Sequence, residues 1–235
     1  MSDASTAAAP AGRLTPLATK IACTRDGGEE PQSMEPKRRY VLRKNCLSLA
    51  EKLARGGKKC VVLAPANNRA PGGPDGEEMF GRTDLLETLG TELYPIDSAE
   101  LSRASLLYSE KVTVLKDASG QAVASPFEIG VISCAAVAHA STKQRDGGGR
   151  TFRHPRDASI TEVKMCGVLE AAARAGADAL IINAAWGRGP LEGIVDLWRK
   201  AFSSSKSPPY VVFAVVPRDG ENADDVAEAF GALAA

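Results

Sequence analysis

The sequence predicts an α/β protein: a three-layer α/β/α sandwich in which helices cover both faces of a mixed, mostly parallel sheet. Short continuous apolar runs recur along the chain, and such runs are typical of strands buried on both faces. Amphipathic stretches separate the runs, and this alternation favours helices packed against a parallel sheet. The chain has 235 residues, 44% hydrophobic and 25% charged, which is close to globular averages and allows a sizeable core.

The first 37 residues are expected to form a flexible leader. They combine prolines and glycines with many small polar residues and show no apolar periodicity. We therefore expect regular structure to begin near Tyr40 and one folded domain to span residues 38–235. The leader is rich in alanine, serine and threonine with few acids, so a plain tail and an organelle transit peptide are both compatible with it.

Each predicted element depends on its own local signal. Asn45 can cap a helix that the following glycines end, and Ser159-Ile160-Thr161-Glu162 has the spacing of a capping box. Met79, Leu85, Leu86 and Leu89 are expected to face inward from one helix. In order, the sequence predicts a helix from Asn45 to Gly56, a strand at 59–64, a helix from Glu77 to about Gly90, strands at 111–115 and 127–133, a polar glycine-rich loop at 141–157, a helix from Ser159 to Gly176, a strand at 179–183, a helix around Trp198, a strand at 210–216 and a helix at 223–233.

Charge and cysteine usage exclude several function classes. The 29 basic side chains balance the 29 acidic ones, which argues against broad binding to nucleic acid. No apolar run approaches the roughly 20 residues of a membrane span, and no secretory signal precedes the domain. The five cysteines show no C-x-x-C spacing and there are two histidines, so we expect reduced thiols in an intracellular protein, cytoplasmic or nuclear, with no metal or cofactor.

The loop at 66–78 is the first candidate binding element, because ligands of such sheets gather where loops leave the carboxyl ends of strands. Gly72 and Gly73 allow backbone N–H groups to approach a ligand closely, and the helix that follows can attract phosphate. Asn67 and Asn68 offer amides to ribose hydroxyls or a base.

Glu77 and Glu78 follow in the first helical turn. One interpretation places a catalytic carboxylate beside the ligand. The other is structural: Asp75 and Glu78 have capping-box spacing, and the helix dipole favours acids in a first turn.

The loop at 183–190 is the second candidate, and it also joins a buried strand to a helix. Gly187 and Gly189 flank Arg188, which suits an oxyanion, although a tight turn with a solvated arginine has the same pattern. Trp186 and Trp198 are expected in the core, and His139 and His154 in structural or surface positions.

Several of these segments together resemble the microbial-type poly(ADP-ribose) glycohydrolases. The run 61–73 resembles that family's strand and Pro-Gly-Gly-Gly loop, and Glu77-Glu78 with 82–85 resembles its Gln-Glu-Glu helix start. The segments 127–135, 160–203 and 210–214 resemble its central strand, its penultimate helix, strand and diphosphate loop, and its last strand. The agreement keeps the same order from about Tyr40 to Val216, which suggests a divergent member.

The resemblance implies a macrodomain-like sandwich that hydrolyses the ribose–ribose bond of poly(ADP-ribose) or a related conjugate, on its own or attached to protein. It implies Glu78 as general acid and base, with Glu77 positioning the ribose and no cofactor. The residues that it implies for ADP-ribose binding are Asn67, Asn68, Gly72, Gly73, Ala185, Trp186, Gly187, Arg188 and Gly189.

The chain departs from the family pattern in both loops. Pro74 replaces the third glycine, Gly76 replaces the glutamine, and fewer residues separate the glycines from the glutamates. Arg188 stands between the glycines of the second loop, and no aromatic residue follows, so Phe152 is a substitute candidate for stacking on adenine. Two alternatives stay open: a non-catalytic ADP-ribose reader, and an enzyme for another derivative such as mono-ADP-ribosyl protein, ADP-ribosylated nucleic acid or acetylated ADP-ribose.

Overall fold

The structure is a computed structural model that describes residues 18–23, 38–72, 77–96, 104–137, 140–144, 150–184, 186–187, 189–205, 210–215 and 222–234. Its strands are β1 (Ala18–Cys23), β2 (Arg38–Leu42), β3 (Cys60–Pro65), β4 (Ala104–Lys116), β5 (Ala122–Cys134), β6 (Thr142–Gln144), β7 (Arg150–Phe152), β8 (Ala179–Asn183) and β9 (Tyr210–Ala214). Its helices are α1 (Cys46–Arg55), α2 (Glu77–Arg82), α3 (Leu85–Thr88), α4 (Pro155–Arg174), α5 (Leu191–Ser204) and α6 (Ala223–Gly231), with a 3₁₀ turn at Thr91–Leu93.

Seven of the strands form one mixed sheet in the order β1-β4-β5-β3-β8-β9-β2. The five strands from β5 to β2 are parallel, whereas β4 runs antiparallel to both of its neighbours. Val62, Ile181 and Val212 lie opposite one another on the neighbouring strands β3, β8 and β9. The mixed, mostly parallel sheet of the sequence prediction is confirmed.

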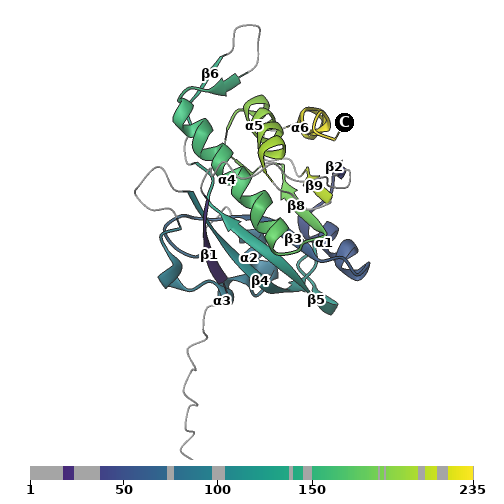
Figure 1. Cartoon of the computed structure of the whole chain (residues 1–235). Coiled ribbons are helices and arrows are strands. Elements are labelled where there is room, and N and C mark those ends of the chain that lie inside the picture. The colour runs from purple at the N-terminus through teal and green to yellow at the C-terminus, as the bar shows by residue number, and fades with distance from the viewer. Residues whose placement is uncertain are drawn as a thin grey trace, which may run out of the picture.

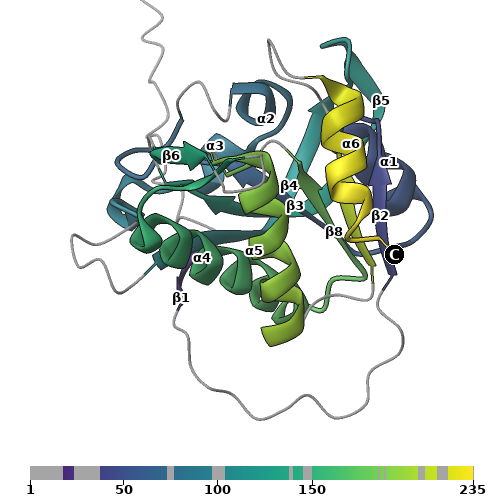
Figure 2. The same cartoon turned by 90° about the horizontal axis from the view of Figure 1, so that it is seen from above.

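Helices cover both faces of this sheet (Figures 1 and 2). Helices α4, α5 and α6 pack on one face, and α1, α2 and α3 on the other. Strand β3 shows how the faces are divided, because Val61 and Leu63 contact the first helix layer while Val62 and Ala64 contact the second. All four side chains are buried, as the continuous apolar run predicts. Among the described helices, none is long and apolar enough to cross a bilayer.

Strand β1 lies in the segment for which the sequence predicted a flexible leader. It pairs antiparallel with β4, with Ala18 opposite Ser109 and Cys23 opposite Ala104. The prediction is wrong for these six residues, because it rested on local periodicity while the pairing partner comes much later in the chain. The remainder of residues 1–37 lies outside the described part of the chain.

The helix predicted from Glu77 to Gly90 is two short helices, α2 and α3. Asp84 interrupts it by pairing with β4: its backbone N–H donates to the carbonyl of Thr113, and its carboxylate accepts from the Thr113 N–H at 2.7 Å. Leu86 was predicted to face inward but is 49% exposed, because α3 starts after the break and does not continue the face of α2. Met79, Leu85 and Leu89 are buried as expected.

Two further elements differ from their predictions around residue 150. The glycine-rich loop contains a hairpin of β6 and β7, whose turn at 145–149 lies outside the described residues. Helix α4 begins at Pro155, so the predicted capping box at Ser159 lies inside the helix. Proline is favoured at the first helical position, and this signal outweighs the capping-box spacing four residues later.

Candidate functional site

The two candidate loops leave the carboxyl ends of β3 and β8, which are neighbouring parallel strands. They therefore start side by side at one edge of the sheet, where open α/β sheets bind ligands. The carbonyl of Cys134, at the end of β5, ties this edge together. It accepts one hydrogen bond from the Ala66 N–H at 3.3 Å and another from the Trp186 indole N–H at 3.1 Å.

The first loop exposes both predicted asparagines. Asn67 uses its side-chain carbonyl within the loop, where it accepts from the Arg69 N–H at 2.8 Å. The carbonyl of Asn68 accepts from the Ile96 N–H at 2.8 Å, which fixes the loop backbone and leaves the side chain exposed. Gly72 has φ of 90°, a left-handed conformation that favours glycine. Gly73 and the rest of the turn to Gly76, including the predicted Asp75 cap, lie outside the described residues.

The second loop is shaped by close contacts to its glycines. Gly187 has φ of 90°. A Cβ atom on Gly189 would lie 2.5 Å from the ring of Phe152, so only glycine fits between the ring and the loop. Phe152 is 7% exposed and packs beneath this loop, which argues against the suggested stacking on adenine. Ala185 and Arg188 lie outside the described residues.

Trp186 and Trp198 are core residues, as predicted, with exposures of 1% and 0%. Because the Trp186 ring is enclosed and its N–H is bonded to Cys134, any contact that Trp186 makes with a ligand has to come from its backbone. His154 stands immediately before α4 and is exposed, whereas His139 lies outside the described residues.

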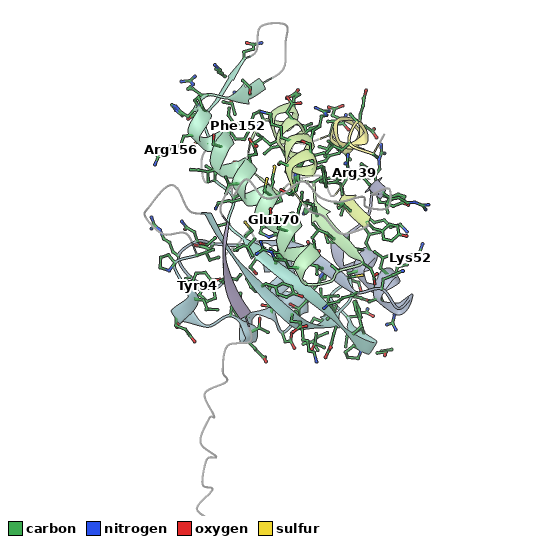
Figure 3. All side chains as sticks on the ribbon, in the orientation of Figure 1. Arg39, Lys52, Tyr94, Phe152, Arg156 and Glu170 are labelled. Carbon is green, nitrogen blue, oxygen red and sulfur yellow. The ribbon has the colours of Figure 1, made fainter. Side chains whose placement is uncertain are left out.

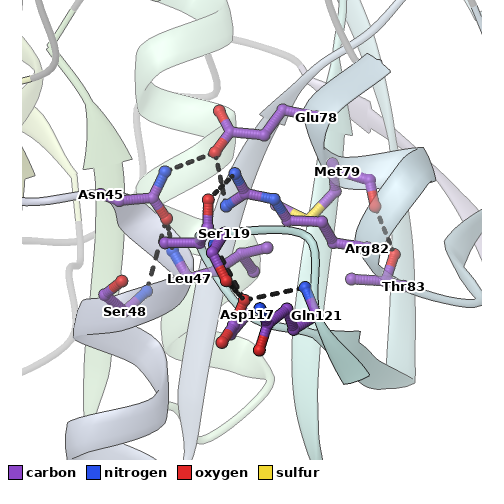
Figure 4. A network of polar contacts seen from close by, with 11 residues as sticks. Asn45, Leu47, Ser48, Glu78, Met79, Arg82, Thr83, Asp117, Ser119 and Gln121 are labelled. Atoms are coloured by element: carbon purple, nitrogen blue, oxygen red, sulfur yellow. Dashed lines mark hydrogen bonds and ion pairs between the residues drawn. The ribbon is translucent and has the colours of Figure 1, made fainter. Parts of the chain in front are cut away.

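Glu78 lies in the first turn of α2, and its side chain is 53% exposed. One carboxylate oxygen, Oε1, makes both of its contacts: it accepts a short hydrogen bond from the Asn45 amide and pairs with the Arg82 guanidinium at 2.8 Å. Among the described residues, Oε2 has no partner, and Figure 4 shows it directed away from Asn45 and Arg82. The carboxylate is therefore anchored through one oxygen and open to solvent through the other. Glu77 is the first residue of the same helix, and its side chain lies outside the described part of the structure.

Asn45 orients Glu78 from the neighbouring helix. Its side-chain carbonyl caps α1 by accepting from the N–H groups of Leu47 and Ser48 at 2.9 and 3.4 Å. Because the carbonyl is used for the cap, the amide nitrogen is turned outward and donates to Glu78 (Figure 4). The sequence predicted the cap but not this second contact, which joins residues 33 positions apart.

Arg82 holds Glu78 from within α2, one helical turn further on. Its second amino group donates to the carbonyl of Ala118 at 2.9 Å, in the turn between β4 and β5. The side chain is 17% exposed, so this guanidinium is largely enclosed between the Glu78 carboxylate, with which it forms an ion pair, and the Ala118 carbonyl. The i, i+4 spacing of Glu78 and Arg82 is the local sequence signal for such a pair.

Two further groups are the half-buried thiol of Cys46 and the buried amino group of Lys164. Burial, and in second place the Glu78 carboxylate, raise the pKa of the Cys46 thiol to about 12, so a neutral thiol lies close to the carboxylate at ordinary pH. Lys164, 2% exposed on α4, donates to the carbonyl of Ala135 at 2.6 Å and so fixes the chain just after β5. No group of three or more potential metal-ligating side chains occurs in the described ranges.

Solved structures of bacterial poly(ADP-ribose) glycohydrolases have a similar fold. The protein from Thermomonospora curvata aligns with a TM-score of 0.70 at 18% identity, covering 91% of this chain and 85% of its own. The protein from Deinococcus radiodurans, in complex with ADP-ribose, aligns with a TM-score of 0.64 at 21% identity, covering 82% of each chain. The Thermomonospora curvata protein bound to the inhibitor ADP-HPD aligns with a TM-score of 0.64 at 19% identity, covering 83% of this chain and 78% of its own. No family model and no curated protein matches the sequence.

The structural likeness extends over most of both chains, so it concerns the whole domain rather than a common substructure. It agrees with the ordered sequence resemblance from about Tyr40 to Val216, which rests on different evidence. This chain has the macrodomain-like fold of the bacterial poly(ADP-ribose) glycohydrolases.

Proposed function

We propose that this chain is a divergent microbial-type poly(ADP-ribose) glycohydrolase, which cleaves the ribose–ribose O-glycosidic bond of poly(ADP-ribose) or of a related ADP-ribose conjugate. The observation that carries the proposal is the placement of Glu78. Its carboxylate is fixed through one oxygen and accessible through the other, in the helix that follows the first glycine-containing loop. A carboxyl group in this situation can act as a general acid and base.

The reaction needs two proton transfers, one from Glu78 and one to it. Protonated Oε2 of Glu78 donates its proton to the leaving ribose oxygen while the bond from that oxygen to the anomeric carbon breaks. The carboxylate then takes a proton from a water molecule, and the water oxygen bonds to the anomeric carbon, which restores the acid. Asn45 and Arg82 leave Oε1 out of this cycle, because both contact that oxygen.

The two loops supply the binding groups in this proposal. Gly72, Gly73, Gly187 and Gly189 allow backbone N–H groups to approach the diphosphate, and Arg188 pairs with it. The other binding groups are the side chains of Asn67 and Asn68 and the backbone of Ala185 and Trp186, with Glu77 positioning the scissile ribose.

A non-catalytic ADP-ribose reader is the second candidate. The first loop favours it, because Pro74 removes a backbone donor where the family has glycine and because the loop is short. A displacement of about 1 Å between acid and leaving oxygen can lower a rate by a large factor without abolishing binding.

Calorimetric titration with ADP-ribose, combined with an assay of poly(ADP-ribose) cleavage, separates the candidates. A glycohydrolase binds ADP-ribose and shortens the polymer. If ADP-ribose binds but the polymer, mono-ADP-ribosyl protein and acetylated ADP-ribose are all left uncleaved, the protein is a non-catalytic ADP-ribose reader. No binding of ADP-ribose contradicts both candidates.

The contact between Asn45 and Glu78 gives a separate expectation. In Asn45→Asp the cap of α1 is kept, but the new carboxylate cannot donate to Glu78 and repels it, so we expect wild-type stability with cleavage reduced by about tenfold or more. Asn45→Ala removes the cap as well and should cost about 1 kcal/mol of unfolding free energy.

Asn222→Ala provides the matched control, since Asn222 caps α6 by accepting from the Asp224 N–H and lies on the opposite helix layer. It should lower the unfolding free energy to a similar extent and leave cleavage unchanged. Cleavage by Asn45→Asp at the wild-type rate would show that the amide does not position Glu78. The measurements are urea unfolding and the initial rate of cleavage.

A further inference from the structure

The hairpin of β6 and β7 and the first turn of α4 carry a concentration of positive charge. Lys143, Arg150, Arg153 and Arg156 are all exposed, and we call these four side chains the hairpin patch. Asp157 is the one acidic residue among the described residues from 140 to 157. In the described part of the chain, none of the four basic side chains forms an ion pair. A chain with no net charge therefore has a strongly basic surface at one place.

The structure of this region does not need that charge. Arg153 and Arg156 lie at the N-terminal end of α4, where the helix dipole is positive and basic side chains are unfavourable. Within the described residues, the Arg150 side chain makes one hydrogen bond, from its guanidinium to the Thr142 hydroxyl at 2.6 Å. These cations therefore contribute little to the stability of the fold, which suggests that they serve to bind an anionic partner.

The hairpin patch adjoins the second candidate loop. Phe152 of β7 packs against Gly189, and a Cβ atom there would touch its ring. Side chains two positions apart in a strand project from the same face, so Arg150 faces the same side as Phe152. Figure 3 shows Phe152 and Arg156 at the same end of the molecule, where the hairpin meets the start of α4.

We propose that the hairpin patch binds the phosphates of the ADP-ribose units next to the unit held in the site, so that the protein recognises a poly(ADP-ribose) chain and not only its terminal unit. This inference rests on the proposed function. Each added unit of the polymer brings one diphosphate, and arginine guanidinium groups pair well with phosphate oxygens. The patch and the site then act on the same molecule, and contacts at both raise the affinity for the polymer above that for ADP-ribose.

The test compares polymer and monomer binding in two multiple variants, both made with Glu78→Gln to prevent hydrolysis. The patch variant carries Lys143→Gln, Arg150→Gln, Arg153→Gln and Arg156→Gln. The control variant removes the same charge from exposed lysines elsewhere, through Lys52→Gln, Lys58→Gln, Lys111→Gln and Lys200→Gln. Fluorescence titrations use size-fractionated poly(ADP-ribose), and calorimetry uses ADP-ribose.

We expect the patch variant to bind the polymer at least about tenfold more weakly than the control variant, with unchanged affinity for ADP-ribose. The slope of log K against log salt concentration for the polymer should decrease by roughly 3, as expected for four lost phosphate contacts to a single strand. Single-stranded RNA with the same number of phosphates should bind weakly, because it cannot occupy the ADP-ribose site.

Three results overturn the inference. Equal polymer affinity in the patch and control variants would exclude a role for the patch and leave the proposed function intact. RNA binding as tight as polymer binding would make the patch a general polyanion surface. Failure of the wild-type protein to bind ADP-ribose would contradict the proposed function, and the inference about the patch would be lost with it.

Discussion

Glu78→Gln is expected to abolish cleavage of poly(ADP-ribose) while ADP-ribose binds with nearly wild-type affinity. Glutamine keeps the shape of the side chain and an Oε1 acceptor for Asn45 beside Arg82, so the local structure should persist. Its amide cannot transfer a proton to the leaving oxygen or take one from water. General acid and base catalysis contributes factors of roughly 10² to 10⁴, so kcat should fall by about that much. The measurement is the initial rate at saturating polymer, with calorimetric titration of ADP-ribose on the same preparation.

Glu87→Gln is the matched control, because Glu87 is an exposed glutamate on α3, the helix that follows. It makes the same chemical change without touching Asn45 or Arg82 and should leave kcat unchanged. A Glu78→Gln protein with kcat within about twofold of wild type would remove Glu78 from the chemistry. Loss of ADP-ribose binding together with cleavage would instead assign Glu78 to binding.

Trp198→Ala is expected to cause a large loss of stability, lowering the unfolding free energy by about 3–5 kcal/mol. Trp198 is fully buried on α5 and lies at the centre of an aromatic cluster. Its ring centroid is 6.1 Å from that of Trp186, 5.9 Å from that of Phe202 and 5.7 Å from that of Phe213. Truncation leaves a cavity between α5 and the sheet that these rigid rings cannot fill.

Trp198→Phe separates ring packing from the indole N–H. That N–H is buried without a hydrogen-bond partner in the described structure, and an unpaired buried polar group is costly. Phenylalanine removes this cost while keeping much of the contact area, so we expect a loss of less than about half that of Trp198→Ala. Urea unfolding followed by circular dichroism measures both variants. Equal losses would show that the N–H has an unobserved partner or that phenylalanine does not pack there.

Local sequence signals predicted the centre of the fold. In β3 and β8 nearly every side chain is apolar and buried, so each strand can be predicted from its own residues without knowledge of its neighbours in the sheet. The Asn45 cap and the helix around the buried Trp198 were likewise correct because they depend on residues within a few positions. The three-layer architecture follows from these elements alone.

Elements that depend on distant partners were missed. Strand β1 exists through its pairing with β4, and the helix after Glu77 is broken by Asp84 bonding to Thr113 on that same strand. The candidate site likewise combines features set by local sequence with features set by distant partners. The position of Glu78 in a first helical turn was predicted locally, whereas its contact with Asn45 crosses 33 residues and has no local signal.

Helix α2 is held by side-chain contacts that lie outside the preceding loop. The length of that loop therefore does not by itself determine the position of Glu78. Glu78 is held by Asn45, and Arg82 by the Ala118 carbonyl, so neither anchor belongs to the loop that begins at Ala66. Residues can then be lost or gained between Gly72 and Glu77 while the carboxylate keeps its place. Under the proposed function, the substrate-binding loop can then change in length and sequence while the position of Glu78 stays constant.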